Sequence, residues 1–156
     1  MKLFLVQHGE AKAETEDPER SLTDRGAEIV GLMAGWTARM GIRVDQIRHS
    51  GKRRAEQTAT IFARQLHPPR GLLAVKGLNP NDDVTSVVAT LQGEQESIML
   101  VGHLPHLNRL VGMLVTGNPD NVVVRFRNAG IVCLTQKEGK WAVEWVMQPD
   151  LLGDAG

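Results

Sequence analysis

Two histidines and one arginine occupy positions from which their side chains could act on the same phosphoryl group. His8 follows an apolar run at 3–6 with one residue between, and His103 closely follows a second run at 97–101. Arg54 lies near the start of a predicted helix. A neutral imidazole is a good nucleophile toward phosphorus, and the guanidinium fork matches phosphate oxygens. These residue types therefore predict binding of a phosphoryl group and its transfer to a histidine nitrogen.

Short apolar runs alternate with helical patterns along the chain, which predicts a parallel sheet. Buried strands are expected over Leu3–Val6 and Ser97–Val101, because continuous apolar runs of this length are typical of parallel strands. A weaker strand is expected over Val44–His49 and a short one over Leu72–Val75. Ligands of open parallel sheets bind at the carboxyl ends of the strands. The two histidines and the arginine are therefore expected to converge at that edge.

Capping residues mark where the predicted helices begin. Thr23 is the expected N-cap of a helix that ends near Met40, and Ser50 is the expected N-cap of the next helix. Apolar residues at helical spacing predict two further helices, near 84–91 and 107–114.

The last two predicted strands form an antiparallel hairpin of Gly130–Thr135 with Trp141–Met147 around a turn at 137–140. Period-two alternation predicts that Trp141 and Trp145 share one face of the last strand. The expected fold class is α/β, a three-layer α/β/α sandwich whose central sheet is mainly parallel with a late antiparallel hairpin.

The composition describes a chain of balanced charge that fits one domain over 1–156. Its 18 basic and 18 acidic residues give a formal net charge of zero, so no global field favours nucleic acid or an anionic membrane. Cys133 is the single cysteine, and its apolar neighbours indicate a packed strand position. The N-terminal apolar run is too short for a signal peptide or a membrane span. A cytoplasmic protein without nucleic-acid or membrane partners is therefore expected.

Four segments together resemble the histidine phosphatase superfamily, and most closely its small SixA-type members. They are His-Gly-Glu-Ala at 8–11, Leu-Thr-x-x-Gly at 22–26, Ser-x-x-x-Arg-Ala-x-Gln-Thr at 50–58 and Gly-His-Leu-Pro at 102–105. The likeness covers nearly the whole chain, and the chain lacks the long insertion of the mutase and acid-phosphatase relatives. The resemblance implies a phosphoglycerate mutase-like fold.

The resemblance also implies a role for each motif residue. His8 would take the phosphoryl group, and water would then hydrolyse the phosphohistidine. Arg54 and His103 would bind the equatorial oxygens and stabilise the charge of the transition state. No metal or other cofactor is implied. The further residues implied in substrate binding are Gln7, Gly9, Arg20 and Leu104.

One position departs from the family pattern, which opens with Arg-His-Gly where this chain has Gln7 before His8. Glutamine donates an amide hydrogen bond but carries no charge. A hydrogen bond to a charged group is worth roughly 1.5–3 kcal/mol, or about one to two decades in rate if it is expressed fully in the transition state. The substitution predicts a slowed enzyme rather than an inactive one.

The identity of a proton donor is a separate question. Enzymes that cleave alkyl phosphates need an acid to protonate the leaving oxygen. Asp82, Asp83 and Glu10 are the candidates, although Asn-Asp-Asp before a helix also fits ordinary capping. A phosphohistidine has a better leaving group, so a substrate of that kind does not demand a dedicated acid.

Two other patterns point to function more weakly. His103 and His106 have the spacing of a metal pair, but Pro105 and the lack of a nearby carboxylate or cysteine argue against one. His106 is instead expected at the mouth of the site or at the helix cap. The run Lys52-Arg53-Arg54 lacks the interleaved aromatic residues of a nucleic-acid patch.

The expected function is that of a phosphohistidine phosphatase acting on a histidine-phosphorylated signalling or phosphotransfer protein, with phosphate as the product. Two alternatives stay open. One is a general small-molecule phosphomonoesterase, and the other is a phosphate- or phosphoprotein-binding module that has lost turnover because of Gln7.

Overall fold

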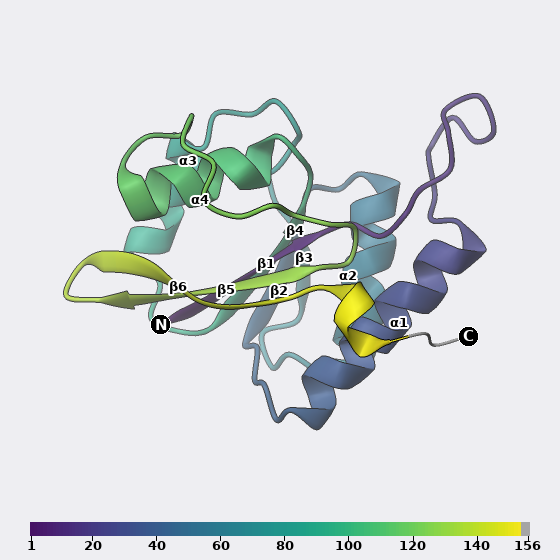
Figure 1. The fold of residues 1–156 in the computed structure, drawn as a ribbon, viewed down its shortest axis with the longest axis horizontal. Helices are drawn as coiled ribbons and strands as arrows, with labels where there is room; N and C mark the ends of the chain where they lie inside the picture. Colours follow the sequence, from purple (N-terminus) through teal and green to yellow (C-terminus); the bar gives the residue numbers. More distant parts are fainter. Residues whose placement is uncertain (154–156) are drawn as a thin grey trace.

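A computed structural model describes residues 1–153 of the chain and shows a sheet between two layers of helices (Figure 1). The end of the predicted domain, 154–156, lies outside the described residues. The strands are β1 (Lys2–Gln7), β2 (Gln46–His49), β3 (Leu72–Ala74), β4 (Ile98–Gly102), β5 (Ile131–Lys137) and β6 (Lys140–Met147). The helices are α1 (Asp24–Arg39), α2 (Arg53–Leu66), α3 (Thr85–Gln92), α4 (His106–Thr116) and the short 3-10 helix η1 (Pro149–Leu152).

The six strands are ordered β3-β2-β4-β1-β5-β6 across the sheet. The first four of these are mutually parallel, whereas β5 pairs antiparallel with both β1 and β6. Glu138 and Gly139 join the hairpin with φ angles of 53° and 76°, as expected for a two-residue turn with both central residues at positive φ. The predicted α/β fold with a late antiparallel hairpin is confirmed.

Strand β1 is buried on both faces, which explains its continuous apolar sequence. Leu3 and Leu5 pack into the core under α3 and α4, while Phe4 and Val6 pack into the core under α1 and α2. All four side chains are at most 1% exposed. A helix layer on each face is what a parallel sheet requires, and the predicted three layers are therefore present.

The helix starts confirm one predicted cap and correct the other. The Gly26 N–H donates to Thr23 Oγ1 at 2.9 Å, so Thr23 is the N-cap of α1. Ser50 is not the N-cap of α2, because the helix begins two residues later than predicted, with Lys52 at the cap. Gly51, at a φ of 89°, extends the turn between β2 and the helix. The Ser50 hydroxyl is thereby left for another contact.

The prediction for the two tryptophans of β6 is wrong. A bulge opposite the Cys133–Leu134 step interrupts the register of β5 with β6, and a bulge shifts later side chains to the other face. Trp141 therefore packs against the core under α3 and α4, whereas Trp145 packs against the core under α1 and α2. Trp145 lies edge-on to Trp36, with 5.7 Å between the ring centroids.

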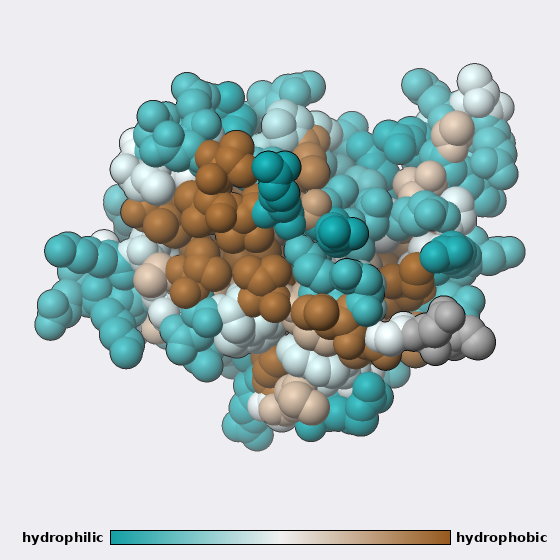
Figure 2. All heavy atoms as spheres, viewed as in Figure 1, coloured by the Kyte–Doolittle hydropathy of each residue, from teal (hydrophilic) through white to brown (hydrophobic). Residues whose placement is uncertain are grey.

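The chain between α4 and β5 crosses in front of α4 without joining the sheet (Figure 1). Figure 2 shows apolar side chains gathered on this face of the molecule. Val122 and Val123 of the segment are exposed, while Phe126 is buried in the core under α3 and α4. The segment ends in a turn that brings Asn128 and Ala129 to β1. No helix among residues 1–153 is long and apolar enough to cross a membrane.

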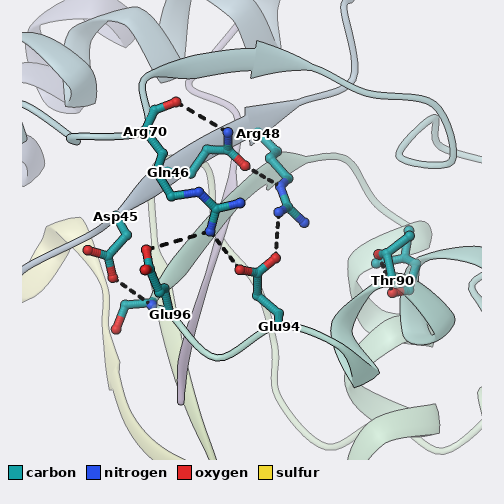
Figure 3. A network of polar contacts seen from close by, with 9 residues as sticks. Asp45, Gln46, Arg48, Arg70, Thr90, Glu94 and Glu96 are labelled. Atoms are coloured by element: carbon teal, nitrogen blue, oxygen red, sulfur yellow. Dashed lines mark hydrogen bonds and ion pairs between the residues drawn. The ribbon is translucent and has the colours of Figure 1, made fainter.

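A network of charged side chains ties the strands together at their amino ends (Figure 3). Glu94, just before β4, accepts hydrogen bonds from Arg48 at 2.7 Å and from Arg70 at 2.6 Å. Arg48 lies on β2, and Arg70 precedes β3. The network therefore joins three strands at the edge opposite the two histidines.

We expect Glu94→Gln to lower the free energy of unfolding by about 2 kcal/mol, because a charge-assisted hydrogen bond is worth roughly 1.5–3 kcal/mol. The matched control is Glu96→Gln, since Glu96 lies 3.6 Å from Arg70 and its side chain is 54% exposed. Such an exposed pair contributes about 0–1 kcal/mol. Urea unfolding of both variants checks the prediction, and equal losses would contradict it.

Candidate functional site

The carboxyl ends of β1 and β4 hold the backbone of His8 in place. The His8 N–H donates to Gly102 O at 3.1 Å. From the other side, Asn128 Nδ2 donates to His8 O at 2.9 Å, and the Ala129 N–H donates to Gln7 O at 2.9 Å. Both backbone polar groups of His8 are therefore engaged, which leaves only the ring to orient.

The ring of His8 is oriented by a hydrogen bond to its neighbour. His8 Nδ1 lies 2.7 Å from Gly9 O. A carbonyl oxygen can only accept, so Nδ1 carries the proton and Nε2 carries the lone pair. Arg54 Nε lies 3.4 Å from that Nε2 atom. The lone pair thus faces the guanidinium that is predicted to bind the phosphoryl oxygens.

Thr58 connects the segment that carries His8 to the helix that carries Arg54. Its hydroxyl oxygen accepts from the Gly9 N–H at 3.0 Å and donates to Arg54 O at 2.8 Å. Thr58 is fully buried. One side chain therefore sets the spacing between two of the predicted site residues, which come from elements about 45 residues apart in the sequence.

His103 is the third of the predicted site residues, and it lies beside His8. Its ring centroid lies 5.1 Å from that of His8, and the two planes are tilted by 50°. Its Nε2 atom lies 2.6 Å from Ser50 Oγ. The structure therefore brings His8, Arg54 and His103 together, as the sequence predicts, and adds Ser50 to them.

Burial and positive charge keep both rings neutral near pH 7. Burial lowers the pKa of His8 to about 4; the hydrogen bond to Gly9 opposes this shift, and the charges of Arg54 and Arg20 add to it. Burial lowers the pKa of His103 to about 3, and repulsion from a proton on His8 and from the charges of Arg54 and Lys52 adds to that shift. Neutral rings beside a guanidinium form a site that favours an oxyanion and retains a nucleophilic nitrogen.

The four residues implied in substrate binding lie around this group in different ways. Arg20, at a φ of 51°, donates from Nε to Lys12 O, and its charge acts on both His8 and Arg54. The Gln7 side chain is half-buried, and its Oε1 atom has no partner among the described residues. Leu104 packs at the edge of the core under α3 and α4.

Gly9 has a packing role that the sequence reasoning did not foresee. A Cβ atom at this position would lie 2.6 Å from Val30 Cγ2 of α1. Its N–H is already bonded to Thr58. The residue therefore lets the segment after β1 lie directly on α1, and its part in substrate binding stays a prediction.

The candidate proton donors have local partners. Asp82 accepts from the Asn79 N–H, and Asp83 accepts from the Thr85 N–H, so both act as turn caps. The hydrogen bonds from Thr85 lower the pKa of Asp83, which disfavours it as an acid near neutral pH. Glu10 accepts from the Thr23 hydroxyl at 2.8 Å and is exposed. A role for any of them stays a prediction.

The prediction for His106 is wrong. The residue is fully buried at the start of α4, so it does not line the mouth of the site. Neither ring nitrogen forms a hydrogen bond to an amide at the start of α4, so it does not cap the helix either. Within residues 1–153, no three His, Cys, Asp or Glu side chains come close enough together to hold a metal ion.

Sequence reasoning missed two contacts in the site. Asn128 has no signal in the sequence, because its bond to His8 O spans 120 residues and no local pattern indicates it. The sequence context of Ser50 predicts only a helix cap. Its place in the motif at 50–58 was the available signal, yet a serine before a helix fits capping equally well.

We expect Ser50→Ala to lower kcat/KM about two- to tenfold, because a neutral hydrogen bond contributes about 0.5–1.5 kcal/mol. The loss follows from freeing the ring of His103 to turn. Ser50→Thr keeps the hydroxyl and is expected to retain most of the activity. Steady-state kinetics with an aryl phosphate checks both variants, and wild-type activity in Ser50→Ala would contradict the prediction.

Two hollows flank the site. One of about 510 Å³ is lined by Arg20 and Arg54 together with residues at the start of α2. A larger one of about 820 Å³ lies between α1, the turn at 127–129 and η1, and none of the three central side chains lines it. Of the three central side chains, Arg54 lines the smaller hollow, beside Arg20.

Comparisons with known proteins agree with this fold. The chain is 30% identical over 155 residues to the phosphohistidine phosphatase SixA of Escherichia coli K12, covering 96% of this chain and 94% of that protein. The structure of the protein histidine phosphatase SixA complexed with tungstate has a TM-score of 0.86 and 29% identity, covering 97% and 99% of the two chains. The alpha-ribazole phosphatase of Shigella flexneri has a TM-score of 0.76 at 16% identity, covering 96% and 97%, and supports the fold alone. No protein-family model matches.

Proposed function

Because this chain belongs to the SixA-type phosphatases of the histidine phosphatase superfamily, we propose that it removes the phosphoryl group from a histidine-phosphorylated protein. The observation that carries the proposal is the ring of His8. Its Nδ1 proton is held by Gly9 O, and its Nε2 lone pair faces Arg54. The name of the Escherichia coli relative supports phosphohistidine as the substrate.

In the first step, the Nε2 lone pair of His8 attacks the phosphorus atom. A P–N bond forms at His8, and the P–N bond to the imidazole of the partner breaks. The bonding electron pair stays on that imidazole, which takes up a proton from solvent water. Arg54 and His103 bind the phosphoryl oxygens, and the low-dielectric site strengthens this stabilisation. Catalysis here rests on positioning and charge.

In the second step, a water molecule attacks the phosphorus atom of phosphorylated His8 and loses a proton. The P–N bond breaks, phosphate leaves, and the electron pair returns to Nε2. The hydrogen bond from Nδ1 to Gly9 O holds the ring in one tautomer through both steps. The leaving group of the first step is an imidazole, so no dedicated protein acid is assigned.

One observation favours a second candidate function. The first position of the family's Arg-His-Gly pattern carries Gln7, and its Oε1 atom has no partner among the described residues. The absence of the arginine charge at this position fits a module that binds phosphate or a phosphoprotein without turning it over. We place this candidate second, because His8, Arg54 and His103 are all in position to act.

The test is incubation of the pure protein, in chelator, with a phosphotransfer domain that carries phosphohistidine, beside the His8→Ala variant. The proposal expects phosphate release that requires His8 and survives the chelator. It also expects an acid-labile phosphoryl group on the wild-type protein after a rapid quench. Binding of the phosphoprotein without release would overturn the proposal in favour of the binding module. Release from an aryl phosphate but not from phosphohistidine would favour a general phosphomonoesterase.

A further inference from the structure

The run Lys52-Arg53-Arg54 has no role for its first two residues in the proposed reaction. Arg54 is the one of the three that donates a hydrogen bond to His8, while the charge of Lys52 acts on His103. Lys52 and Arg53 are exposed at the start of α2, on the wall of the smaller hollow. Since that hollow also has Arg54 and Arg20 in its wall, a group attached to a phosphoryl at His8 would lie against it.

The two cations are available to a partner. Among residues 1–153, no carboxylate oxygen lies within 4.0 Å of the Lys52 ammonium group. Arg53 Nε lies 3.6 Å from Glu19, but the two side chains are 49% and 73% exposed. Exposed pairs at such distances contribute about 0–1 kcal/mol, so a partner carboxylate can replace Glu19 at little cost.

Cations outnumber carboxylates in the lining of the hollow, which holds Lys52, Arg53, Arg54 and Arg20 together with Glu14, Glu19 and Glu56. Three of the four cations form one run at the start of α2, which is called the cationic wall here. Because the whole chain has a formal net charge of zero, attraction of an acidic partner depends on this local run of cations and not on a global field.

We propose that Lys52 and Arg53 form a docking rim for an acidic stretch that flanks the phosphorylated histidine of the partner protein. The proposal rests on the proposed function, because it takes the phosphoryl group to sit at His8. The carboxylates of the partner lie along the cationic wall, and the rim selects among phosphoproteins that present the same phosphohistidine. Rim charges of this kind act mainly on the association rate and its salt dependence.

The experiment compares Lys52→Gln/Arg53→Gln with wild type on two substrates. One is a phosphotransfer domain whose phosphohistidine is flanked by acidic residues, and the other is an aryl phosphate. The ratio of the two kcat/KM values is expected to fall about tenfold, because two rim contacts of about 0.7 kcal/mol each amount to one decade. The salt dependence of the reaction with the protein substrate is expected to flatten.

Arg64→Gln is the matched control, because Arg64 is an exposed cation in the last turn of the same helix. It is expected to keep both the wild-type ratio and the wild-type salt dependence. An unchanged ratio of the two kcat/KM values in the double variant, or an equal fall in Arg64→Gln, would overturn the proposed docking rim.

A binding measurement separates the rim from the proposed function. The dissociation constant of the phosphorylated domain is measured by calorimetry for wild type and for the double variant, at a temperature where turnover is slow or absent. If wild type releases no phosphate, the proposed function fails, and a fivefold or larger rise in this constant still supports the rim. Equal constants, or no binding by either protein, would overturn it.

Discussion

Replacing Gln7 with arginine is expected to raise turnover about ten- to a hundredfold. The backbone of Gln7 is already fixed, since the residue pairs with Gly102 in the sheet and accepts from the Ala129 N–H. The backbone therefore holds any new side chain at this position beside His8. The guanidinium would add a charged hydrogen bond to the phosphoryl oxygens, where the amide of glutamine can offer only a neutral one.

Steady-state kinetics of Gln7→Arg on the phosphorylated domain checks this expectation, with Gln7→Lys as the matched control. Lysine brings the same charge as a point and not as a fork, so its gain should be smaller. Circular dichroism confirms that both variants fold. An unchanged or lower rate in a folded Gln7→Arg protein would show that Gln7 does not limit the enzyme.

The second large effect is a loss of stability in acid. The pKa of His8 is lowered to about 4 and that of His103 to about 3, whereas an unfolded histidine titrates near 6.5. Below pH 6.5 these two rings bind protons in the unfolded chain but stay unprotonated in the folded chain. The contribution of these rings to the free energy of unfolding should therefore reach its full value above about pH 6.5 and should fall as the pH drops toward 4 and 3.

The expected size is about 3 kcal/mol for each ring between pH 7 and pH 4, at 1.36 kcal/mol per unit of pKa difference. Two such terms are comparable with the 5–15 kcal/mol that stabilises a typical domain. Urea unfolding at pH 7, 6, 5 and 4 measures the loss. A phosphate or tungstate ion in the site should reduce it, because a nearby anion favours the protonated rings.

His67→Asn is the control for this effect, because His67 is exposed just beyond the end of α2. The variant should follow the wild-type curve, whereas His8→Asn should lose part of the slope. Stability that stays level between pH 7 and pH 5 would contradict the expectation.

The sheet and the meeting of His8, Arg54 and His103 could be predicted from the sequence, because both depend on local patterns. Apolar runs such as Leu3–Val6 indicate buried strands whatever lies far away in the chain. A residue at the end of such a strand lies at the edge where ligands bind. The family resemblance then assigned the chemistry, and the geometry agrees with it.

The features that could not be predicted depend on contacts across the chain. Ser50 has the sequence context of a helix cap, yet its hydroxyl meets His103, 53 residues later. Asn128 reaches His8 O from a turn of ordinary composition. The complete burial of His106 could not be predicted, because it follows from the packing of α4 and not from the neighbours of His106 in the sequence.

The bulge in the last hairpin also places fluorescent tryptophans in both cores of the protein. The chain has three tryptophans and no tyrosine. Trp36 and Trp145 form one coupled pair on the side of α1 and α2, while Trp141 stands alone on the side of α3 and α4. Emission from Trp141 therefore reports on one layer of helices, and emission from the pair reports on the other. Changing one chromophore at a time would show whether the two layers come apart in a single transition.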